Sequence, residues 1–286
     1  YPIQDDIHEI PSNFGCAAAV LRSFLRTSTP EQKTAAQAAL QALIDEGLLK
    51  PSSGYRELLR LHPWFLVTKT LPGGGIKGRV VVHGAAKDSN GRKMADYLKP
   101  TPSLIPLVSD VLTLFRASRR ALSCDIRKAF FQAKVAPAHM GLNRLLVPEQ
   151  WTTDCDKMVV LELDGAAQGL PSSPFQLSHT QYATFRRFLS THPNHPRITS
   201  EFVHRIHSTL YVDDSLIPLK DTEEPEEVMA DVDELFKSGG FRMTDWAWTG
   251  QVGREDNLVG VLGLNWDVAK DVISMAPGDL PTALQA

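Results

Sequence analysis

Two adjacent aspartates, Asp213 and Asp214, interrupt an apolar stretch that otherwise has the pattern of β-strand. Burying neighbouring carboxylates is unfavourable, because each charge loses hydration and repels the other unless a cation or a donor compensates. The apolar residues on both sides predict two strands joined by a tight turn that carries the acids at its tip. These flanking residues are Ile206, Leu210, Val212, Leu216, Ile217 and Leu219. An isolated Asp-Asp pair is also typical of an ordinary surface turn, so the rest of the chain must decide between the two interpretations.

Asp125 is a third acid in a similar setting, because it lies in the short apolar run Ala121–Ile126, a pattern that predicts a buried strand. If that strand lies beside the hairpin, three carboxylates meet although 88 positions separate Asp125 from Asp213. Buried carboxylates that gather in this way need a metal cation. Two Mg²⁺ ions about 3.5–4 Å apart could be held there, an arrangement that activates an attacking oxygen and stabilises the leaving oxygen in phosphoryl transfer.

The chain around these acids predicts helices and strands of an α+β fold. Thr29–Gln32 has the capping-box pattern with Pro at the first helical position, which predicts a helix over residues 30–46. A second helix is expected over residues 103–118. Its core-facing side would be Leu104, Leu107, Val108, Val111, Leu112 and Phe115. Residues 1–34 would be an N-terminal extension.

From residue 121 onward, the expected order of strand, helix, two strands, helix and strand matches the split β-α-β-β-α-β arrangement. The helices of this part are expected over residues 172–189 and 225–236. Further strands are expected over residues 158–163, 258–264 and 271–275.

Length and composition are those of a globular chain, with 286 residues and 43% hydrophobic content. No window approaches the roughly 20 apolar residues of a membrane span, and the first residues lack the features of a signal peptide. We therefore expect a soluble, intracellular protein without a membrane partner. Cys16, Cys124 and Cys155 show no paired spacing, so neither a disulfide framework nor a zinc site is indicated.

Positive charge is concentrated in one part of the chain. Residues 50–134 contain 16 Lys and Arg against 5 Asp and Glu, whereas the whole chain has a formal net charge of −3. Such a surplus could bind a phosphate backbone, or its side chains could be dispersed over solvated faces. Lys69, Lys77 and Arg79 would line a glycine-rich hairpin here, which suits an anion such as a triphosphate unless the hairpin is merely solvated.

Four motifs occur in the order and approximate spacing of retroelement reverse transcriptases, a family that this chain resembles. They are Asp125-Ile-Arg-Lys-Ala-Phe-Phe131, Gln168-Gly-Leu-Pro-Ser-Ser-Pro-Phe175, Tyr211-Val-Asp-Asp214 and Leu262-Gly-Leu-Asn-Trp266. With the segment Arg79–Lys87, they look most like the BEL/Pao group of long-terminal-repeat retrotransposons. One departure is Val82-His-Gly-Ala85, where that group usually has Phe-Asp-Ala-Ser.

The resemblance covers about residues 35–275 and implies the fingers and palm of a reverse transcriptase. Residues 35–120 would be a fingers-like region with the basic hairpin. Residues 121–275 would be the palm, with the catalytic carboxylates and the primer grip. Residues 276–286 would be a tail, and no thumb or ribonuclease H region is recognisable.

The same resemblance implies roles for single residues in the catalytic centre. Asp125, Asp213 and Asp214 would be the catalytic metal carboxylates, with the backbone carbonyl of Ile126 also near a metal. The metals would be two Mg²⁺ per site, for which Mn²⁺ could substitute.

Roles in substrate binding are implied in the same way. Arg79 and Lys77 would hold the triphosphate of the incoming dNTP, Gln168 would touch the nucleotide and Phe130 would lie under its sugar. The primer grip would be formed by Leu262, Gly263, Leu264 and Trp266.

The function implied is that of an RNA-directed DNA polymerase that adds dNTPs to a primer by two-metal phosphoryl transfer. Its partners would be an RNA or DNA template with primer, dNTPs and flanking domains of a polyprotein, in the cytoplasm or in element-derived particles. One alternative is a catalytically inactive palm scaffold that binds nucleic acid or a protein partner. Another is an RNA-directed RNA polymerase, which is disfavoured because Phe130 would crowd a 2′-hydroxyl and Val212 replaces Gly before the Asp pair.

Overall fold

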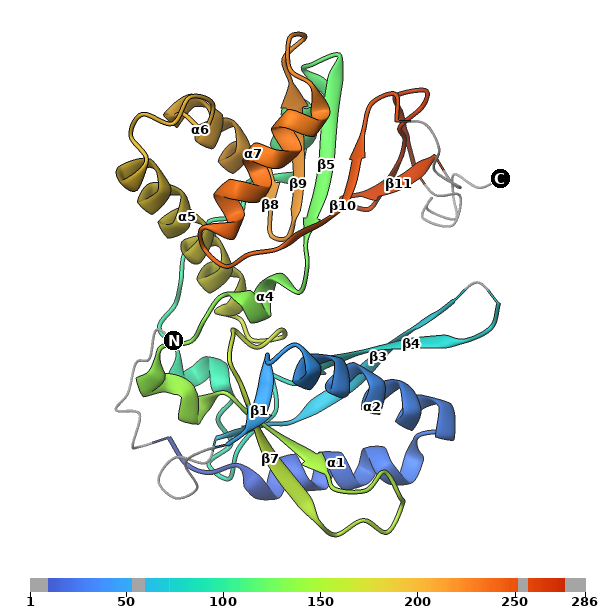
Figure 1. The fold of residues 1–286 in the computed structure, drawn as a ribbon. Helices are drawn as coiled ribbons and strands as arrows, with labels where there is room; N and C mark the ends of the chain where they lie inside the picture. Colours follow the sequence, from blue (N-terminus) through green and yellow to red (C-terminus); the bar gives the residue numbers. More distant parts are fainter. Residues whose placement is uncertain (1–9, 53–59, 72, 252–256, 276–286) are drawn as a thin grey trace. The chain divides into compact units, whose positions relative to one another are not determined.

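The computed structural model describes residues 10–52, 60–71, 73–251 and 257–275, and they form two compact units (Figure 1). Unit 1 combines residues 1–103 with 130–177, and unit 2 combines residues 104–129 with 178–286. This grouping differs from the expected boundaries, because residues 130–177 belong with the N-terminal part and not with the rest of the expected palm. The α+β class is confirmed.

Two helices open unit 1, α1 (Phe14–Thr27) and α2 (Pro30–Asp45). The capping box of α2 is formed as expected: the Gln32 backbone N–H donates to the Thr29 hydroxyl (3.3 Å), and the Thr29 N–H donates to Oε1 of Gln32 (2.9 Å). Helix α1 was not expected, since residues 1–34 were assigned to an extension. Its buried residues Ala17, Leu21 and Leu25 recur every four positions and join the core of unit 1.

In the described part of unit 1, two sheets accompany these helices. One has the order β1-β7-β6-β2, and the other is the antiparallel hairpin of β3 and β4. The strands are β1 (Leu49–Pro51), β2 (Leu61–His62), β3 (Trp64–Thr70), β4 (Ile76–Val82), β6 (Arg144–Pro148) and β7 (Met158–Leu163). Short helices are η2 (Met94–Tyr97), η3 (Pro137–Leu142) and α4 (Ala129–Gln132), whose first residue is counted with unit 2.

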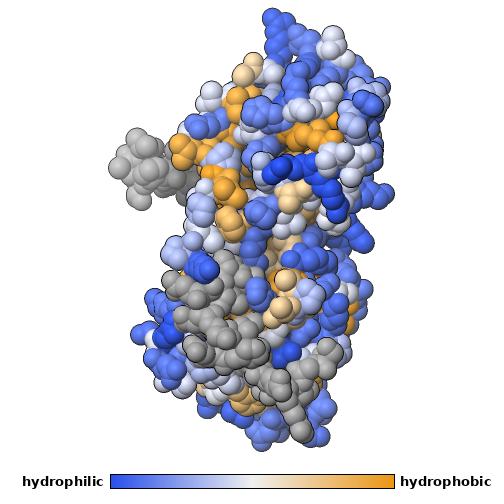
Figure 2. Space-filling model, turned by 90° about the vertical axis from the view of Figure 1, so that its left-hand side faces the viewer, coloured by the Kyte–Doolittle hydropathy of each residue, from blue (hydrophilic) through white to orange (hydrophobic). Residues whose placement is uncertain are grey.

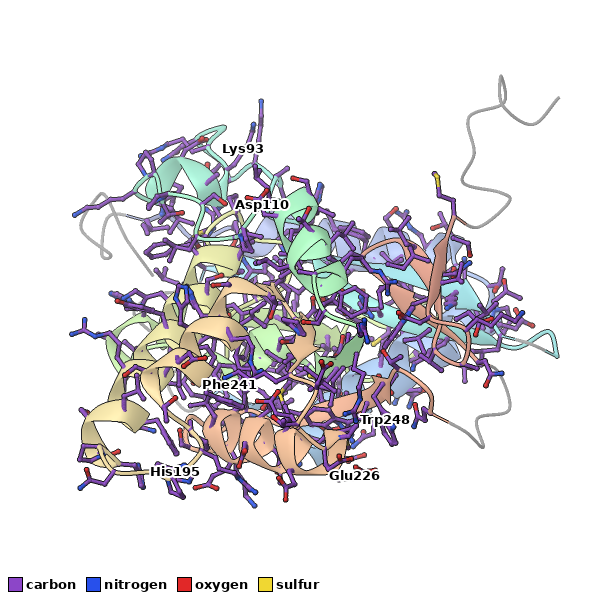
Figure 3. All side chains as sticks on the ribbon, turned by 90° about the horizontal axis from the view of Figure 1, so that it is seen from above. Lys93, Asp110, His195, Glu226, Phe241 and Trp248 are labelled. Carbon is purple, nitrogen blue, oxygen red and sulfur yellow. The ribbon has the colours of Figure 1, made fainter. Side chains whose placement is uncertain are left out.

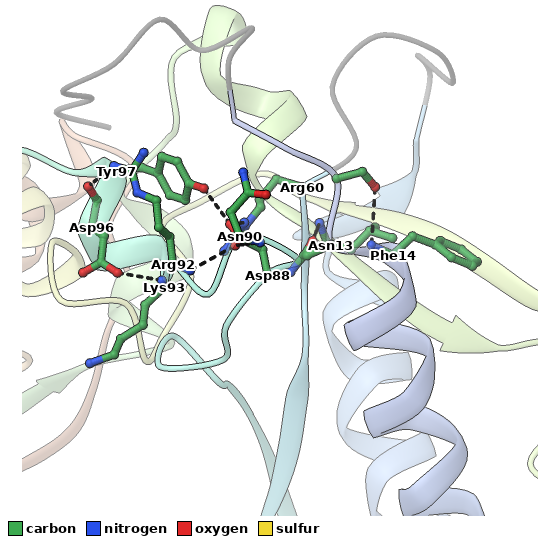
Figure 4. Close-up of polar contacts among 11 residues, drawn as sticks. Asn13, Phe14, Arg60, Asp88, Asn90, Arg92, Lys93, Asp96 and Tyr97 are labelled. Carbon is green, nitrogen blue, oxygen red and sulfur yellow. Dashed lines mark hydrogen bonds and ion pairs between the residues drawn. The ribbon is translucent and has the colours of Figure 1, made fainter.

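A buried carboxylate, Asp88, anchors the segment that follows β4 (Figure 4). It accepts hydrogen bonds from Arg60 (2.8 Å), from the Tyr97 hydroxyl (2.6 Å) and from the backbone N–H groups of Asn90 and Arg92. Burial alone would raise the pKa of Asp88, but these hydrogen bonds lower it to about 2. The segment that departs from the BEL/Pao pattern is therefore followed by an ionised, fully hydrogen-bonded acid.

Unit 2 is built on the antiparallel sheet β10-β5-β9-β8. Its strands are β5 (Arg120–Ile126), β8 (Leu210–Tyr211), β9 (Asp214–Leu219) and β10 (Met243–Trp248). The helices are α5 (Ser173–Thr191), which begins in unit 1, α6 (Ser200–Ser208) and α7 (Pro225–Lys237). In chain order this gives strand, helices, two strands, helix and strand, with β5 and β9 at the centre of the sheet.

Helix α6 corrects the expectation that Ile206 leads into the Asp-Asp hairpin as strand. Thr199 caps this helix by accepting a hydrogen bond from the Phe202 backbone N–H (3.3 Å), and Ile206 is buried on its inner face. The short, half-polar pattern around Ile206 suits either element, so periodicity alone could not distinguish them. Strand β8 is therefore only two residues long.

Helix α3 (Val108–Arg116) is shorter than expected. Pro106 disfavours helical geometry in the residue before it, and the helix begins two residues later. Val111 and Phe115 are buried as expected, whereas Leu104 and Leu107 precede the helix and are exposed, Leu107 at 68%. Figure 2 shows a face of the molecule on which hydrophobic residues lie in patches among hydrophilic ones.

The expected closing strands form a second sheet in unit 2, β11 (Leu258–Val261), β12 (Leu264–Asp267) and β13 (Val272–Ser274). Trp266 packs edge-on against Phe115 with ring centroids 5.1 Å apart, which joins this sheet to α3. Within the described residues, no helix has both the length and the apolar character needed to cross a membrane.

Candidate active site

Strand register brings two of the expected acids together in unit 2. Asp125 on β5 lies directly opposite Asp214 on β9, which in turn lies opposite Tyr211 on β8. On the other side of β5, Thr244 on β10 lies opposite Asp125. Because paired residues of antiparallel strands project from the same face, these four side chains form one row across the sheet.

Asp213 completes the acid group from the two-residue turn between β8 and β9, so Asp213 is at the tip while Asp214 already belongs to β9. The carbonyl of Asp213 accepts a hydrogen bond from the Ile126 backbone N–H (2.9 Å). Val212, the other turn residue, has φ of 58°, a left-handed conformation that is costly for a β-branched side chain. Strain of this kind clusters at functional sites.

Gln181 holds the same turn from α5 and was not identified from the sequence. Its side-chain amide donates to the carbonyl of Val212 (2.9 Å), and the residue is only 2% exposed. The sequence feature that could have identified Gln181 is its position as a polar residue on the inner side of an amphipathic helix, one position before the exposed Tyr182. Both carbonyls of the turn are thus fixed by hydrogen bonds, which holds Asp213 and Asp214 in place.

The electrostatics of the row favour a bound cation. Burial, followed by the charge of Asp213, raises the pKa of Asp214 to about 6. On the other face of the sheet, burial and then the charges of Asp125 and Asp214 raise the pKa of Cys124 well above its usual value, so this thiol stays neutral. A cation beside the acids would relieve the repulsion that raises the pKa of Asp214.

The donor set fits Mg²⁺ in one particular way. Among the described residues, no three His, Cys, Asp or Glu side chains form a ready metal cage. Mg²⁺, however, is commonly held by one or two carboxylates together with substrate phosphates. The paired oxygen ligands of Asp125 and Asp214 suit that mode, in which the substrate completes the coordination.

Lys77 and Arg79 lie on the outer face of the β3–β4 hairpin in unit 1. Lys77 is directly opposite Lys69, Arg79 is opposite Val67, and all four side chains are exposed. Like charges in a cross-strand pair are unfavourable unless an anion lies between them. The sequence identified Lys69 as lining the hairpin, and its register with Lys77 makes it an equal candidate for anion binding.

Gln168 is joined to the same hairpin through its backbone. Its carbonyl accepts a hydrogen bond from the Val82 N–H (2.9 Å) at the end of β4. The loop approaches so closely that a Cβ on Gly84 would lie 2.6 Å from the carbonyl oxygen of Gly169. Gln168 and Arg79 therefore belong to one packed body, with Phe130 half-buried on α4 in the same unit. That these unit 1 residues converge with the acids of unit 2 stays a prediction.

The expected primer grip is the turn between β11 and β12. Leu262 and Gly263 both have positive φ, 48° and 82°, and connect the paired residues Val261 and Leu264. Trp266 is fully buried, and its indole N–H donates to Asp271 (2.9 Å). Its side chain thus supports the turn from the core and is not available to contact a primer directly, whereas Leu262, Gly263 and Leu264 are at least partly exposed.

The fold and the row of acids define an α+β protein whose antiparallel sheet carries carboxylates. Comparison with a solved structure gives a more specific description of this fold. No family model matches the sequence, and neither does any curated protein. The crystal structure of the prototype foamy virus protease-reverse transcriptase, a CSH mutant labelled with selenomethionine, is similar to this chain with a TM-score of 0.53 and 16% sequence identity. The similarity covers 87% of this chain and 26% of that one, so the chain spans about a quarter of the length of the viral protein. At this identity the likeness concerns the fold, which is reverse-transcriptase-like.

Proposed function

We propose that this chain is an RNA-directed DNA polymerase domain that adds dNTPs to the 3′ end of a primer. The observation that carries the proposal is the register of Asp125 opposite Asp214, with Asp213 on the adjoining turn, within a reverse-transcriptase-like fold. Unit 1 corresponds to the fingers and part of the palm, and unit 2 corresponds to the rest of the palm. The BEL/Pao motifs remain our proposal for its origin.

In this proposal the three acids hold up to two Mg²⁺ ions, which activate the primer oxygen and stabilise the leaving oxygen. Asp125 and Asp214 are held opposite each other by the β5–β9 ladder, and the hydrogen bond from Ile126 to the Asp213 carbonyl fixes the turn beside them. Preorganised acids lose little free energy to rearrangement when substrate arrives. Because the pKa of Asp214 is raised to about 6, pH 7 lies only one unit above it, and the side chain is mostly ionised at that pH.

Substrate binding would involve unit 1. Lys77 and Arg79, with Lys69, present three exposed cations on one hairpin face to a triphosphate. Gln168 would contact the nucleotide from a loop anchored to that hairpin, and Phe130 would lie under the sugar. The Leu262–Gly263 turn would support the primer.

The decisive test is primer extension by the purified chain on an RNA template with dNTPs and Mg²⁺. Asp214→Asn should abolish extension, with a loss on the order of 10³-fold or more, because several kcal/mol of metal stabilisation are removed. Asp221→Asn is a matched control, since this exposed acid follows β9 at the far end of the strand. A folded wild-type chain that binds template-primer but extends nothing with Mg²⁺ or Mn²⁺ would instead support the inactive scaffold.

A further inference from the structure

The outer side of α5 and α6 in unit 2 carries an exposed aromatic ring with cationic and imidazole groups beside it. Tyr182 on α5 is 45% exposed, and its ring centroid lies 5.7 Å from that of His207 on α6. The guanidinium carbon of Arg186, one helical turn further along α5, lies 5.8 Å from the same Tyr182 centroid, within the range of a cation–π contact. Figure 1 shows the two helices side by side. These three side chains form one exposed group, the Tyr182 cluster.

A row of rings connects the Tyr182 cluster to the core of unit 2. His207 meets Phe185 edge-on with centroids 6.3 Å apart, and Phe185 meets Phe236 of α7 edge-on at 5.1 Å. Phe185 and Phe236 are almost fully buried. The Tyr182 ring is therefore ordered by packing, although nearly half of the residue is open to solvent. Such a ring can stack on a flat ligand with little further loss of conformational freedom.

The electrostatic surroundings of the cluster differ from those of α7. The chain contains no Asp or Glu between Asp164 and Glu201, a stretch that includes the whole of α5. Glu201 itself is paired with Lys220 (2.8 Å), and within the described part of the chain no acid forms an ion pair with Arg186. Acids gather instead on α7, whose first turn contains Glu226 (Figure 3). The guanidinium group of Arg186 is thus available to an anion from outside the chain.

An ordered, exposed ring beside an unpaired guanidinium group matches the chemistry of a nucleotide. A nucleobase has a flat π-face that stacks on an aromatic side chain, whatever the identity of the base. The planar, forked donors of a guanidinium group match phosphate oxygens. An acidic peptide would use the guanidinium group but would leave the ring without a stacking partner. Only unpaired bases expose their faces to a side chain, so the ligand that fits is single-stranded.

We propose that the Tyr182 cluster binds single-stranded nucleic acid, with one base stacked on Tyr182 and an adjoining phosphate bound by Arg186. This surface is distinct from the row of acids. Gln181, one position earlier on α5, is buried and donates to the Val212 carbonyl beside those acids, whereas Tyr182 faces solvent. The site therefore lies on a different side of α5 from the candidate active site, and it does not depend on the proposed polymerase activity.

The test is fluorescence anisotropy of a labelled thymidine oligonucleotide of about 12 nucleotides, a length within the range that single-strand sites cover. The full chain is titrated with an excess of unlabelled, blunt-ended duplex present, which occupies the proposed polymerase site. Tyr182→Ala should weaken binding about tenfold, because the stacking of one base is lost, whereas Tyr182→Phe keeps the ring and should retain the affinity. Phe14→Ala is the matched control, since Phe14 is also 45% exposed but lies on α1 in unit 1, and it should change nothing.

Two further measurements examine the phosphate contact and the location of the base. Arg186→Gln should weaken binding and reduce the slope of log affinity against log salt concentration by about 0.7, the value for one phosphate contact on a single strand. An oligonucleotide that carries 5-iododeoxyuridine forms a covalent link on irradiation to a ring on which its base is stacked. Peptide mapping by mass spectrometry should find that link at Tyr182 in the wild-type chain.

Each outcome decides the proposal. Unchanged oligonucleotide affinity in Tyr182→Ala, or crosslinks only at other residues, would overturn it and make Tyr182 an ordinary surface residue. An abasic oligonucleotide of the same length should bind the wild type as weakly as the thymidine oligonucleotide binds Tyr182→Ala; equally tight binding would overturn the stacking contact. Displacement of the oligonucleotide by polyglutamate at equal charge concentration would overturn the proposal in favour of an acidic peptide. If Tyr182→Ala loses binding while the wild-type chain extends no primer, the single-strand site stands and only the polymerase function fails.

Discussion

Asp214→Asn should stabilise the metal-free protein at neutral pH, although the same change should abolish activity. Burial and the charge of Asp213 raise the pKa of Asp214 from its ordinary value of 3.8 to about 6. A shift of about two units corresponds to roughly 3 kcal/mol of unfavourable free energy for the ionised folded form. An amide at this position has the same shape but no charge, so the variant lacks this penalty.

The sign of the pH dependence follows from the direction of the shift. A folded-state pKa above the unfolded value means that the folded protein binds more protons between about pH 4 and pH 6. The contribution of Asp214 to stability is therefore fully present below pH 3.8 and is lost as the pH rises through about 6. The stability advantage of Asp214→Asn should be small at pH 4.5 and approach its ceiling of roughly 3 kcal/mol near pH 7.5.

Urea unfolding of wild type, Asp214→Asn and Asp221→Asn at pH 4.5 and 7.5 measures this effect. Addition of Mg²⁺ at ten times its Kd should stabilise the wild type by about 1.4 kcal/mol, because binding to the folded state alone adds RT ln(1 + [L]/Kd). The stabilisation by Mg²⁺ should be largely lost in Asp214→Asn. If Asp214→Asn is less stable than wild type at pH 7.5, or if its advantage does not change with pH, then Asp214 is not a buried, repelled acid and the electrostatic argument for a metal fails.

Three further changes test other parts of the structure. Asp88→Asn should lower the free energy of unfolding by about 3–5 kcal/mol in urea denaturation, because it leaves buried Arg60 without its partner charge; a loss below 1 kcal/mol would show that the ion pair is dispensable. Gln181→Met should lower the free energy of unfolding by about 1–3 kcal/mol, because the Val212 carbonyl loses its donor. The same change should lower kcat while changing the KM for dNTP much less, and unchanged steady-state kinetics would exclude a positioning role. Phe130→Val should raise rNTP incorporation about tenfold relative to dNTP in single-nucleotide kinetics, since the ring would otherwise exclude a 2′-hydroxyl; an unchanged ratio would make Phe130 an ordinary packing residue.

The sequence was sufficient for the parts of the site that depend on local pattern. Apolar runs interrupted by acids predicted that the strand of Asp125 lies beside the hairpin of Asp213 and Asp214, and β5 and β9 pair in that way. The capping box at Thr29 predicted the start of α2, because its two hydrogen bonds involve residues only three apart.

Features that depend on tertiary packing were not predictable. Trp266 lies within a motif expected to hold the primer, yet its ring is buried against Phe115, and no pattern within the motif indicates which side chains face inward. The grouping of residues 130–177 with the N-terminal part depends on long-range strand pairing. Helix α1 was missed although its buried alanines and leucines have helical spacing, since the interpretation of the N-terminal segment gave that spacing no weight.

Unit 1 consists of two separate segments of the chain, and this affects how it folds during synthesis. Leu49 of β1 pairs with Leu163 of β7, so this pairing cannot form until β7 has left the ribosome. By then the whole of β5, which belongs to unit 2, has already emerged. Long-range pairing of this kind is slow and leaves apolar surface exposed in the meantime. A fragment that stops at residue 103 would lack both β6 and β7 and should therefore aggregate when expressed alone.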